Sequence, residues 1–588
     1  MSSLTPVRLD VKPMPSTSGA NSQSVEGSSV AQPSSLNINA SSDRDPPERK
    51  RKPSRSPSPS AARDAIKLSK EAEAGPSRPL PSKQARPDGK QSAQDRNKAK
   101  KRQKALRKQW AEQVAKTGEK PIHHDIVEML GADVVERLIK EGKEFEERME
   151  RKEYTLTIDR LSSYGEGLAI SPDRDWVIAI PHALPGELVR AYVFSNERLY
   201  AKARLVEVVE RAPLRQEAAC QYFKSCAGCQ YQHLGYDEQL RIKRDVIIKA
   251  YKHFSNLPPD LIPDIAPTLP SPEQFGYRTK LTPHFELPFQ IRAFHRSKGK
   301  KSLPAVQPEL QIGFDRIDGP GVLDIEECPL ATRVINEALP DARQSVKSNI
   351  SSFKNGATLL LRDSLRSHDP EDVACEVVRD HNASVRERVD SMKFENPAGA
   401  FWQNNRSILP SVIAYVRQAI VDHPPAPSSD DSKRYLVDTY CGSGFFALCL
   451  ADLFEKVSGV ELSKDSIKYA KTNVQLNGIK NADFLAGSAE NIFSQISFPS
   501  HMTTVVIDPP RRGCDVPFLE QLRKLSPHLI VYVSCNVHTQ ARDIGWLLEA
   551  DPDYKIVSIR GADFFPQSHH VESIAVLHKP NKPAGPPL

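Results

Sequence analysis

Three short apolar runs in the last third of the chain lie next to residues that can do chemistry. Residues 529–533 lead to Cys535, residues 503–507 lead to Asp508, and Glu572 comes just before a third run. Apolar runs of this length predict buried strands, and ligands bind at the carboxyl ends of strands in open α/β sheets. Cys535 is therefore a candidate nucleophile facing a ligand cleft.

A glycine-rich turn follows another apolar run, 435–439, and includes Gly442 and Gly444. Glycines there let the backbone approach a ligand closely. The next predicted strand ends at Glu461, 19 positions after Gly442, where a carboxylate can accept hydrogen bonds from an adenosine ribose. The dinucleotide pattern GxGxxG would need glycine where Ala447 stands. The turn therefore favours a class I methyltransferase that uses S-adenosylmethionine over a dehydrogenase.

A thiol facing a methyl donor suits methylation of a pyrimidine carbon. Carbon 5 of uracil is a weak nucleophile, but addition of the Cys535 thiolate to carbon 6 makes an enolate whose carbon 5 can attack a methyl group. A general base must then remove the proton from carbon 5 so that the thiol can leave. His569, His570 and Glu572 precede the last predicted strand, and we favour Glu572. Arg511 follows the Asp-Pro-Pro triplet, where amino-methylating enzymes carry an aromatic residue, which argues against adenine-N6 chemistry.

Five motifs occur in one order along the chain: Phe401-Trp402-Gln403-Asn404-Asn405, Asp438-Thr439-Tyr440-Cys441-Gly442-Ser443-Gly444, Asp508-Pro509-Pro510-Arg511, Val533-Ser534-Cys535-Asn536 and His569-His570-Val571-Glu572. Together they resemble the RNA 5-methyluridine methyltransferase family, specifically its eukaryotic tRNA (uracil-5-)-methyltransferase branch, over about residues 153–580.

The resemblance implies a role for each matching position. Gln403, Tyr440, Glu461 and Asp508 would contact S-adenosylmethionine. Cys535 would be the nucleophile and Glu572 the base, with uridine 54 of the tRNA T-loop as the target. Phe445 stands where bacterial tRNA-modifying relatives have a cofactor-binding asparagine, so that contact is not carried over.

Alternating strand and helix patterns predict an α/β architecture: a class I, Rossmann-like methyltransferase domain, an N-terminal OB-type β-barrel and a mixed α+β central domain. We expect a disordered Ser/Pro-rich basic tail over 1–117, a helical lead-in over 118–152 and the barrel over 153–210. The central domain would cover 211–395, the methyltransferase domain 396–580 and a short tail 581–588. Within these, we expect helices over 131–152 and 237–254 and an irregular section over 257–310.

A five-stranded barrel is expected from four short strand patterns, at 154–158, 176–180, 187–193 and 203–208. Its turns, at 163–167 and 183–187, resemble those of the TRAM module of RNA-modifying enzymes. Barrels of this type often bind nucleic acid. We therefore expect the barrel and the basic tail to hold an RNA backbone while the target base flips out to reach Cys535.

A second cysteine set consists of Cys220, Cys226, Cys229 and Cys328. Four thiols suit a zinc ion or an iron–sulfur cluster. The set resembles the cluster-binding cysteines of the ribosomal-RNA branch of the family, and we favour a [4Fe-4S] cluster. Zinc and unmetallated thiols are the alternatives.

Composition excludes some classes and leaves others open. The 588-residue chain has a net charge of +7 and no apolar run long enough for a membrane helix. The runs 49–52 and 98–108 are basic enough to contact phosphates or to direct nuclear import, so we expect a location in the nucleus or the cytoplasm, with mitochondrial import left open. We also expect a monomer. Ribosomal RNA is the rival substrate, methylation of cytosine is a weaker alternative, and an RNA-binding or folding factor without activity is the rival from another class.

Overall fold

The computed structural model describes residues 93–297, 309–425, 433–487, 493 and 496–580, all within one compact unit, Leu80–Leu588. None of the helices described is long and apolar enough to cross a membrane. The expected tails, 1–92 and 581–588, lie outside the described residues.

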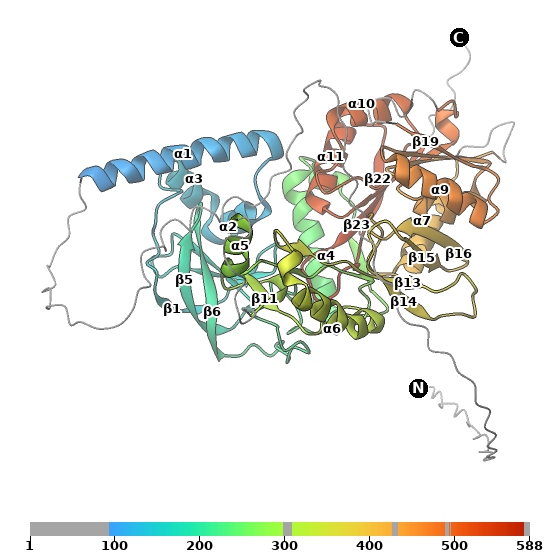
Figure 1. Cartoon of the computed structure of the whole chain (residues 1–588). Helices are drawn as coiled ribbons and strands as arrows, with labels where there is room; N and C mark the ends of the chain where they lie inside the picture. Colours follow the sequence, from blue (N-terminus) through green and yellow to red (C-terminus); the bar gives the residue numbers. More distant parts are fainter. Residues whose placement is uncertain (1–92, 298–308, 426–432, 488–492, 494–495, 581–588) are drawn as a thin grey trace, which may run out of the picture. The chain divides into compact units, whose positions relative to one another are not determined.

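The largest sheet among the described residues has eight strands in the order β19-β18-β17-β20-β21-β23-β22-β7. Its strands β19, β22 and β23 are labelled in the orange and red part of the chain (Figure 1). Neighbouring strands from β19 to β21 pair in parallel, β23 runs antiparallel to both β21 and β22, and β7 is parallel to β22. The expected parallel sheet is therefore mixed at one end. The strands are β7 (Ala266–Leu269), β17 (Tyr435–Thr439), β18 (Lys456–Glu461), β19 (Ala482–Ala486), β20 (Thr503–Ile507), β21 (Leu529–Ser534), β22 (Lys555–Ala562) and β23 (Glu572–His578).

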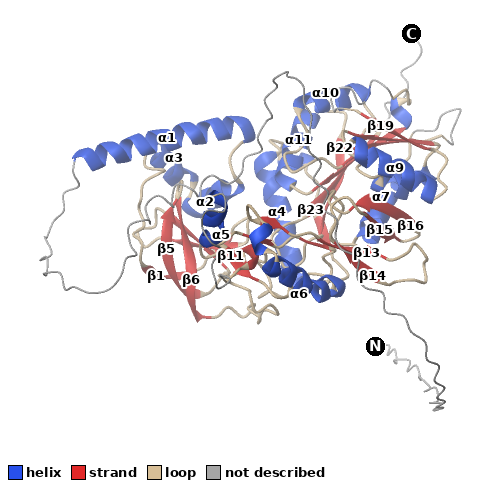
Figure 2. Ribbon diagram, viewed as in Figure 1, coloured by secondary structure: helices blue, strands red, loops and turns tan. Residues whose placement is uncertain are grey.

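Helices cover both faces of this sheet (Figure 2) because its buried strands are apolar on both sides. Alternate strand residues enter different cores: Val506 and Val531 pack on one side, Val505 and Ile530 on the other. One side is covered by α7 (Leu409–Asp422), α8 (Phe445–Cys449) and α9 (Lys464–Leu476), the other by α4 (Tyr236–Phe254), α10 (Val516–Leu525) and α11 (Val537–Ala550).

Segment 236–269 packs with this eight-stranded sheet, although we placed the segment in the central domain: β7 is one of its strands, and α4 covers one of its faces. Helix α4 packs its residues Val246, Ile247 and Tyr251 into the same core as α11. The approach is close, because a Cβ on Gly545 of α11 would lie 1.7 Å from the carbonyl oxygen of Ser255. The domain bounds 211–395 and 396–580 are therefore wrong for this segment.

The expected barrel region forms a six-stranded sheet in the order β1-β5-β6-β4-β3-β2 around the buried side chain of Trp176. The four strand patterns are confirmed, but the sheet has six strands where five were expected. Strands β2 and β3 lie on either side of the expected turn at 163–167, and β3 begins inside it. The strands are β1 (Glu153–Thr157), β2 (Arg160–Leu161), β3 (Glu166–Ile170), β4 (Val177–Pro181), β5 (Leu188–Asn196) and β6 (Tyr200–Glu210).

Among the residues described from Ala93 onward, three helices precede this sheet: α1 (Ala93–Thr117), α2 (Pro121–Leu130) and α3 (Ala132–Lys140). The expectation of disorder is therefore wrong over 93–117, where Ala, Lys, Arg and Gln are strong helix formers. The helix expected over 131–152 ends at Lys140, shortly before Gly142, whose φ is +69°. After the glycine-rich turn, the apolar sequence from Phe445 to Phe454 also predicts a helix, but helix α8 ends at Cys449.

The remaining central segment is mixed, as expected, with short strands in three small sheets. Its irregular section from 257 contains ordered elements, and residues 298–308 lie outside the described part of the chain. The elements are β8 (Lys280–Leu281), β9 (His284–Phe285), α5 (Phe289–Arg296), β10 (Ile312–Asp315), β11 (Val322–Asp324), α6 (Arg333–Ser348), β12 (Ala357–Thr358), β13 (Leu361–Leu365), β14 (Cys375–Val378), β15 (Ser384–Val389) and β16 (Met392–Pro397).

Candidate active site

A cavity of about 680 Å³ opens at the carboxyl edge of the parallel strands. All six candidate residues of the catalytic domain line it: Gln403, Tyr440, Glu461, Asp508, Cys535 and Glu572. Strand register explains the convergence. Thr439 pairs with Ile507 on one side and Val460 on the other, so the residues that follow these three, Tyr440, Asp508 and Glu461, leave the sheet at one level.

Cys535 and Glu572 meet because β23 runs antiparallel to β21. Ser534 of β21 pairs with Ser573 of β23. Cys535 is the next residue along β21, and Glu572 is the residue before Ser573, so both lie at the same level of the sheet edge. If β23 ran parallel to β21, its first residue, Glu572, would lie at the opposite edge of the sheet from Cys535.

The glycine-rich turn is shaped for close approach of a ligand. Gly442 and Gly444 have φ of +54° and +90°, a region that glycine adopts without strain. The Gly442 N–H donates to Glu461 Oε2 at 3.2 Å, and the Ser463 N–H donates to Glu461 Oε1 at 2.8 Å. These bonds fix the carboxylate at the cavity wall, and each oxygen keeps a lone pair for a ligand hydroxyl.

Burial changes the protonation of the groups around the thiol. It raises the pKa of Asp508 to about 7 and the pKa of Glu572 well above its usual value. Burial, and then the carboxylates of Glu572 and Asp508, raise the pKa of the Cys535 thiol to about 11. Arg511 acts in the opposite sense on the thiol, through its charge and a hydrogen bond. The resting site therefore holds a neutral thiol beside a guanidinium that favours the thiolate.

Arg511 is a site residue that the sequence analysis missed, because we used it only to exclude amino methylation. The cation beside Asp-Pro-Pro was the available signal. Its backbone is fixed from the nucleophile's loop: the Asn536 amide and the Thr539 hydroxyl both donate to the Arg511 carbonyl oxygen, at 2.8 and 3.3 Å. The Asn536 side chain also caps α11, so one residue ties the two loops together.

Cys535 also lines a second cavity, of about 390 Å³, which contains none of the other five candidate residues. Aromatic and imidazole rings surround it, including Tyr164 of the barrel region, Phe254, His538 and His569. Burial lowers the pKa of His538 and of His569 to about 4, so both rings are neutral near pH 7. This cavity therefore combines flat, uncharged rings with the cationic side chains of Lys120, Arg511, Arg512 and Arg542.

His569 and His570, our alternative bases, do not line the cavity that Glu572 shares with Cys535 and Asp508. They lie on the second cavity, and burial lowers the pKa of His570 to about 3. Among the three candidates for the base, only Glu572 faces the first cavity.

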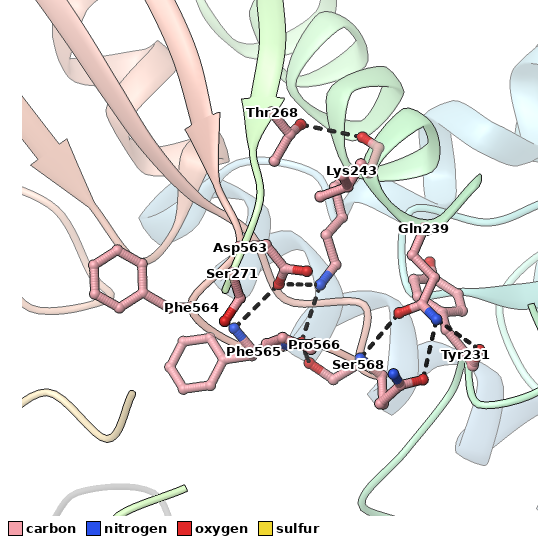
Figure 3. A network of polar contacts seen from close by, with 12 residues as sticks. Tyr231, Gln239, Lys243, Thr268, Ser271, Asp563, Phe564, Phe565, Pro566 and Ser568 are labelled. Carbon is pink, nitrogen blue, oxygen red and sulfur yellow. Dashed lines mark hydrogen bonds and ion pairs between the residues drawn. The ribbon is translucent and has the colours of Figure 1, made fainter. Parts of the chain in front are cut away.

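The loop that leads to Glu572 is held by buried contacts from α4 (Figure 3). The Lys243 ammonium donates to Asp563 Oδ1 at 2.5 Å and to the Phe565 carbonyl at 3.0 Å, and the Lys243–Asp563 pair is fully buried. Gln239 exchanges two hydrogen bonds of 3.0 Å with Gln567, one with its side-chain oxygen and one with its backbone N–H. These contacts link residues more than 300 positions apart and fix the chain just before the candidate base.

The second cysteine set converges on a cavity of about 350 Å³ lined by Cys220, Cys226, Cys229 and Cys328. All four are free thiols, and burial raises the pKa of each. Within the part of the chain that the structure describes, no three His, Cys, Asp or Glu side chains are arranged so as to hold a metal ion. The donor chemistry fits a metal group, but the four thiols are not drawn together around a common centre.

The sheet, the glycine-rich turn and the acidic residue after the second strand define the class I methyltransferase fold. The solved structure of Pyrococcus abyssi tRNA (uracil-54, C5)-methyltransferase, in complex with S-adenosyl-L-homocysteine, has this fold, with a TM-score of 0.51 and 23% identity over 72% of this chain and 100% of that chain.

A family model described as tRNA (Uracil-5-)-methyltransferase matches residues 376–580. The tRNA (uracil(54)-C(5))-methyltransferase of Schizosaccharomyces pombe is 45% identical over 432 residues, which cover 73% of this chain and 78% of the relative. The Saccharomyces cerevisiae enzyme of the same name is 38% identical, over 73% of this chain and 74% of its own length. The chain belongs to the tRNA (uracil-5-)-methyltransferase family.

The Lys243–Asp563 pair allows a stability prediction. Lys243→Met leaves a buried carboxylate without its cation, so we expect a loss of about 3–5 kcal/mol in the free energy of unfolding. Lys252→Met removes an exposed partner of Glu128 from the same helix and should cost no more than about 1 kcal/mol. Urea denaturation measures both. Equal losses in the two variants would contradict a stabilising role for the buried Lys243–Asp563 pair. Partial recovery of the free energy of unfolding in the double variant Lys243→Met/Asp563→Asn would support that role.

The thiol environment predicts how Cys535 reacts with iodoacetamide. Because its pKa is raised to about 11, the alkylation rate should rise about tenfold per pH unit from pH 7 to 10. Arg511→Gln should lower the rate at pH 9 by raising the thiol pKa further. Arg512→Gln, on the same cavity wall, is the matched control and should leave the rate unchanged. The readout is mass spectrometry of the Cys535 peptide, and a rate that levels off near pH 8.5 contradicts the assignment.

Proposed function

We propose that this protein methylates carbon 5 of uridine 54 in the T-loop of tRNA. The names of the two yeast relatives support the position, and membership of the family supports the reaction. The observation that carries the proposal is the single cavity that holds Cys535, Asp508 and Glu572 together with the donor-site candidates.

The methyl-donor part of the cavity would be formed by Gln403, Tyr440, Glu461 and Asp508. Glu461 accepts the ribose hydroxyls, because its two oxygens are already fixed by backbone N–H groups. Tyr440 packs against Phe518, with ring centroids 5.3 Å apart, and this contact holds its ring at the cavity wall. S-adenosylmethionine, when bound here, supplies an electrophilic methyl group.

The reaction then follows from the protein's own groups. The Cys535 thiol gives its proton to solvent, a step favoured by Arg511, and its sulfur bonds to carbon 6 of the uracil. The enolate formed on the base has a nucleophilic carbon 5, which takes the methyl group, and S-adenosylhomocysteine would leave. The Glu572 carboxylate accepts the proton from carbon 5, the carbon–sulfur bond breaks, and the thiolate leaves with its electron pair. Burial makes Glu572 a stronger base than an exposed carboxylate.

The uracil would reach Cys535 through the second cavity after flipping out of the T-loop. Tyr164 and His569, whose ring centroids are 5.9 Å apart, offer surfaces on which bases can stack. Tyr164 belongs to the six-stranded barrel region, which supports our proposal that residues 153–210 are an RNA-binding TRAM module.

We further propose that Cys220, Cys226, Cys229 and Cys328 hold a [4Fe-4S] cluster once its iron and sulfide draw the thiols together. Their shared cavity and the absence of disulfides among them support this. The cavity also includes Phe565 and His570, from the loop before Glu572, so a cluster would help to order that loop. The role of the cluster would be structural, because methyl transfer by this route needs no electron donor or acceptor.

The reaction can be tested with tRNA that contains 5-fluorouridine. Fluorine at carbon 5 cannot leave as a proton, so elimination stops and the protein stays bound through Cys535. We expect a denaturation-resistant adduct with the wild type, mapped by mass spectrometry to Cys535 and uridine 54, and none with Cys535→Ala. With ordinary tRNA, Glu572→Gln should accumulate the adduct that the wild type resolves.

Several results would redirect or overturn this proposal. An adduct with ribosomal RNA instead of tRNA would mean that ribosomal RNA is the substrate. An adduct with a cytosine of the RNA would mean that the methylated base is cytosine. No adduct with any of these RNAs removes the covalent mechanism, and a Cys535→Ala protein that still restored function in cells would favour an RNA-folding role.

The cluster can be tested on protein purified without oxygen. We expect about four iron and four sulfide ions per chain, lost in Cys226→Ser. Cys375→Ser, which changes a cysteine outside the set, is the control and should keep them. Zinc in place of iron would assign the site to zinc, and protein free of both metals would leave the thiols unmetallated.

A further inference from the structure

Helix α1 has two distinct faces over residues 101–115, where its side chains are described. Residues of the inner face recur at helical spacing and are partly buried: Gln103, Leu106, Arg107, Trp110, Gln113 and Val114. The positions between them, including Lys101, Lys104 and Lys108, are exposed. The helix as a whole carries nine Lys and Arg against two acidic residues. One face therefore docks the helix on the protein, and the other is a basic stripe.

The docking is specific. The Arg107 guanidinium pairs with Glu144 at 2.9 Å and donates to the Gly142 carbonyl. The guanidinium of Arg198 and the ammonium of Lys120 lie 4.8 and 5.1 Å from the centre of the Trp110 ring, as in cation–π contacts. These contacts involve residues on both sides of α2 and α3, so α1 is tied to the folded part of the chain by its inner face.

The exposed lysines have little to neutralise them. Lys108 faces Glu112 across one turn at 3.9 Å, with both side chains largely exposed, a pair worth only a few tenths of a kcal/mol. Neither Lys101 nor Lys104 pairs with a carboxylate among the described residues. Three ammonium groups at positions i, i+3 and i+7 make a stripe about 10 Å long, which is the length of helix axis over which one nucleic-acid strand carries about three phosphates.

The end of α1 leads to the nucleophile. Gln113 near its carboxyl end, and Gly118 and Lys120 just beyond it, line the second cavity together with Cys535. From Lys101 to Gln113 the helix rises about 18 Å, so the stripe lies on the approach to that cavity. An RNA whose base enters the cavity must place its flanking backbone near this helix.

We propose that the outer face of α1 binds the sugar–phosphate backbone of the RNA whose uracil reaches Cys535. The proposal rests on the function proposed above and assigns part of substrate binding to a helix outside the barrel and the methyltransferase domain. Phosphate contacts of this kind position the RNA and carry no sequence information. They should raise affinity and leave the chemical step unchanged.

The test is a triple variant, Lys101→Ala/Lys104→Ala/Lys108→Ala, assayed for tRNA binding at several salt concentrations and for methylation at saturating tRNA. We expect tRNA binding to weaken about tenfold or more at 0.15 M salt. The magnitude of the slope of log K against log salt should fall by about two to three, because three fewer phosphates are neutralised. The rate at saturating tRNA should stay at the wild-type level, since none of the three lysines lines either cavity.

The matched control is Lys468→Ala/Lys471→Ala/Lys480→Ala, which removes the same charge from exposed positions on and just after α9. It should bind tRNA like the wild type. Equal weakening in both triples would mean that net charge alone is felt, and unchanged binding in the α1 triple would leave the stripe to another partner, such as an import receptor; either result overturns the proposal. Failure of the proposed function is distinguishable, because the wild type would then form no 5-methyluridine.

Discussion

The pairing of Ser534 with Ser573 is the contact on which the rest of the site depends. It joins β21 to a strand that runs in the opposite direction, and so brings the start of β23 to the edge where the parallel strands end. Cys535 and Glu572 become neighbours through backbone hydrogen bonds alone, before any side chain is considered. The Tyr440, Glu461 and Asp508 positions reach the same edge through the parallel pairs of β17. A shift of one residue in the β21–β23 register would turn the base to the other face of the sheet.

Burial of this edge of the sheet shifts the pKa values of its carboxyl and thiol groups, and it requires the loop before Glu572 to be held in place. Removing Asp508 and Glu572 from water raises the pKa of both, which strengthens them as bases. The same burial disfavours the Cys535 thiolate, and Arg511 is the cation that opposes this effect. The loop before Glu572 must also stay in place without exposure to solvent, and the Lys243–Asp563 pair and the Gln239–Gln567 contacts provide that hold from α4 (Figure 3).

Sequence patterns pointed to Asp508, Cys535 and Glu572 because each follows or precedes a short apolar run, and the structure places all three on one cavity. The same patterns could not show which segments pack together. Helix α4 was predicted with nearly correct bounds, yet its place in the catalytic core was missed, because its contacts with α11 join residues far apart in the chain. Lys243 and Asp563 carried no local signal as partners, whereas Arg511 stood beside the Asp-Pro-Pro triplet and was used only to exclude amino methylation. Helix α1 was missed because a charged, Lys-rich composition is shared by disordered tails and exposed helices.

The central claim is that Cys535 and Glu572 act on carbon 5 of uracil, and release of the hydrogen at that carbon tests it directly. With tRNA that carries tritium at carbon 5 of its uridines, the account predicts one tritium released to water for each methyl group transferred, and no release with Cys535→Ala. Methylation without tritium release would mean that the methyl group goes to another atom, and would contradict the account.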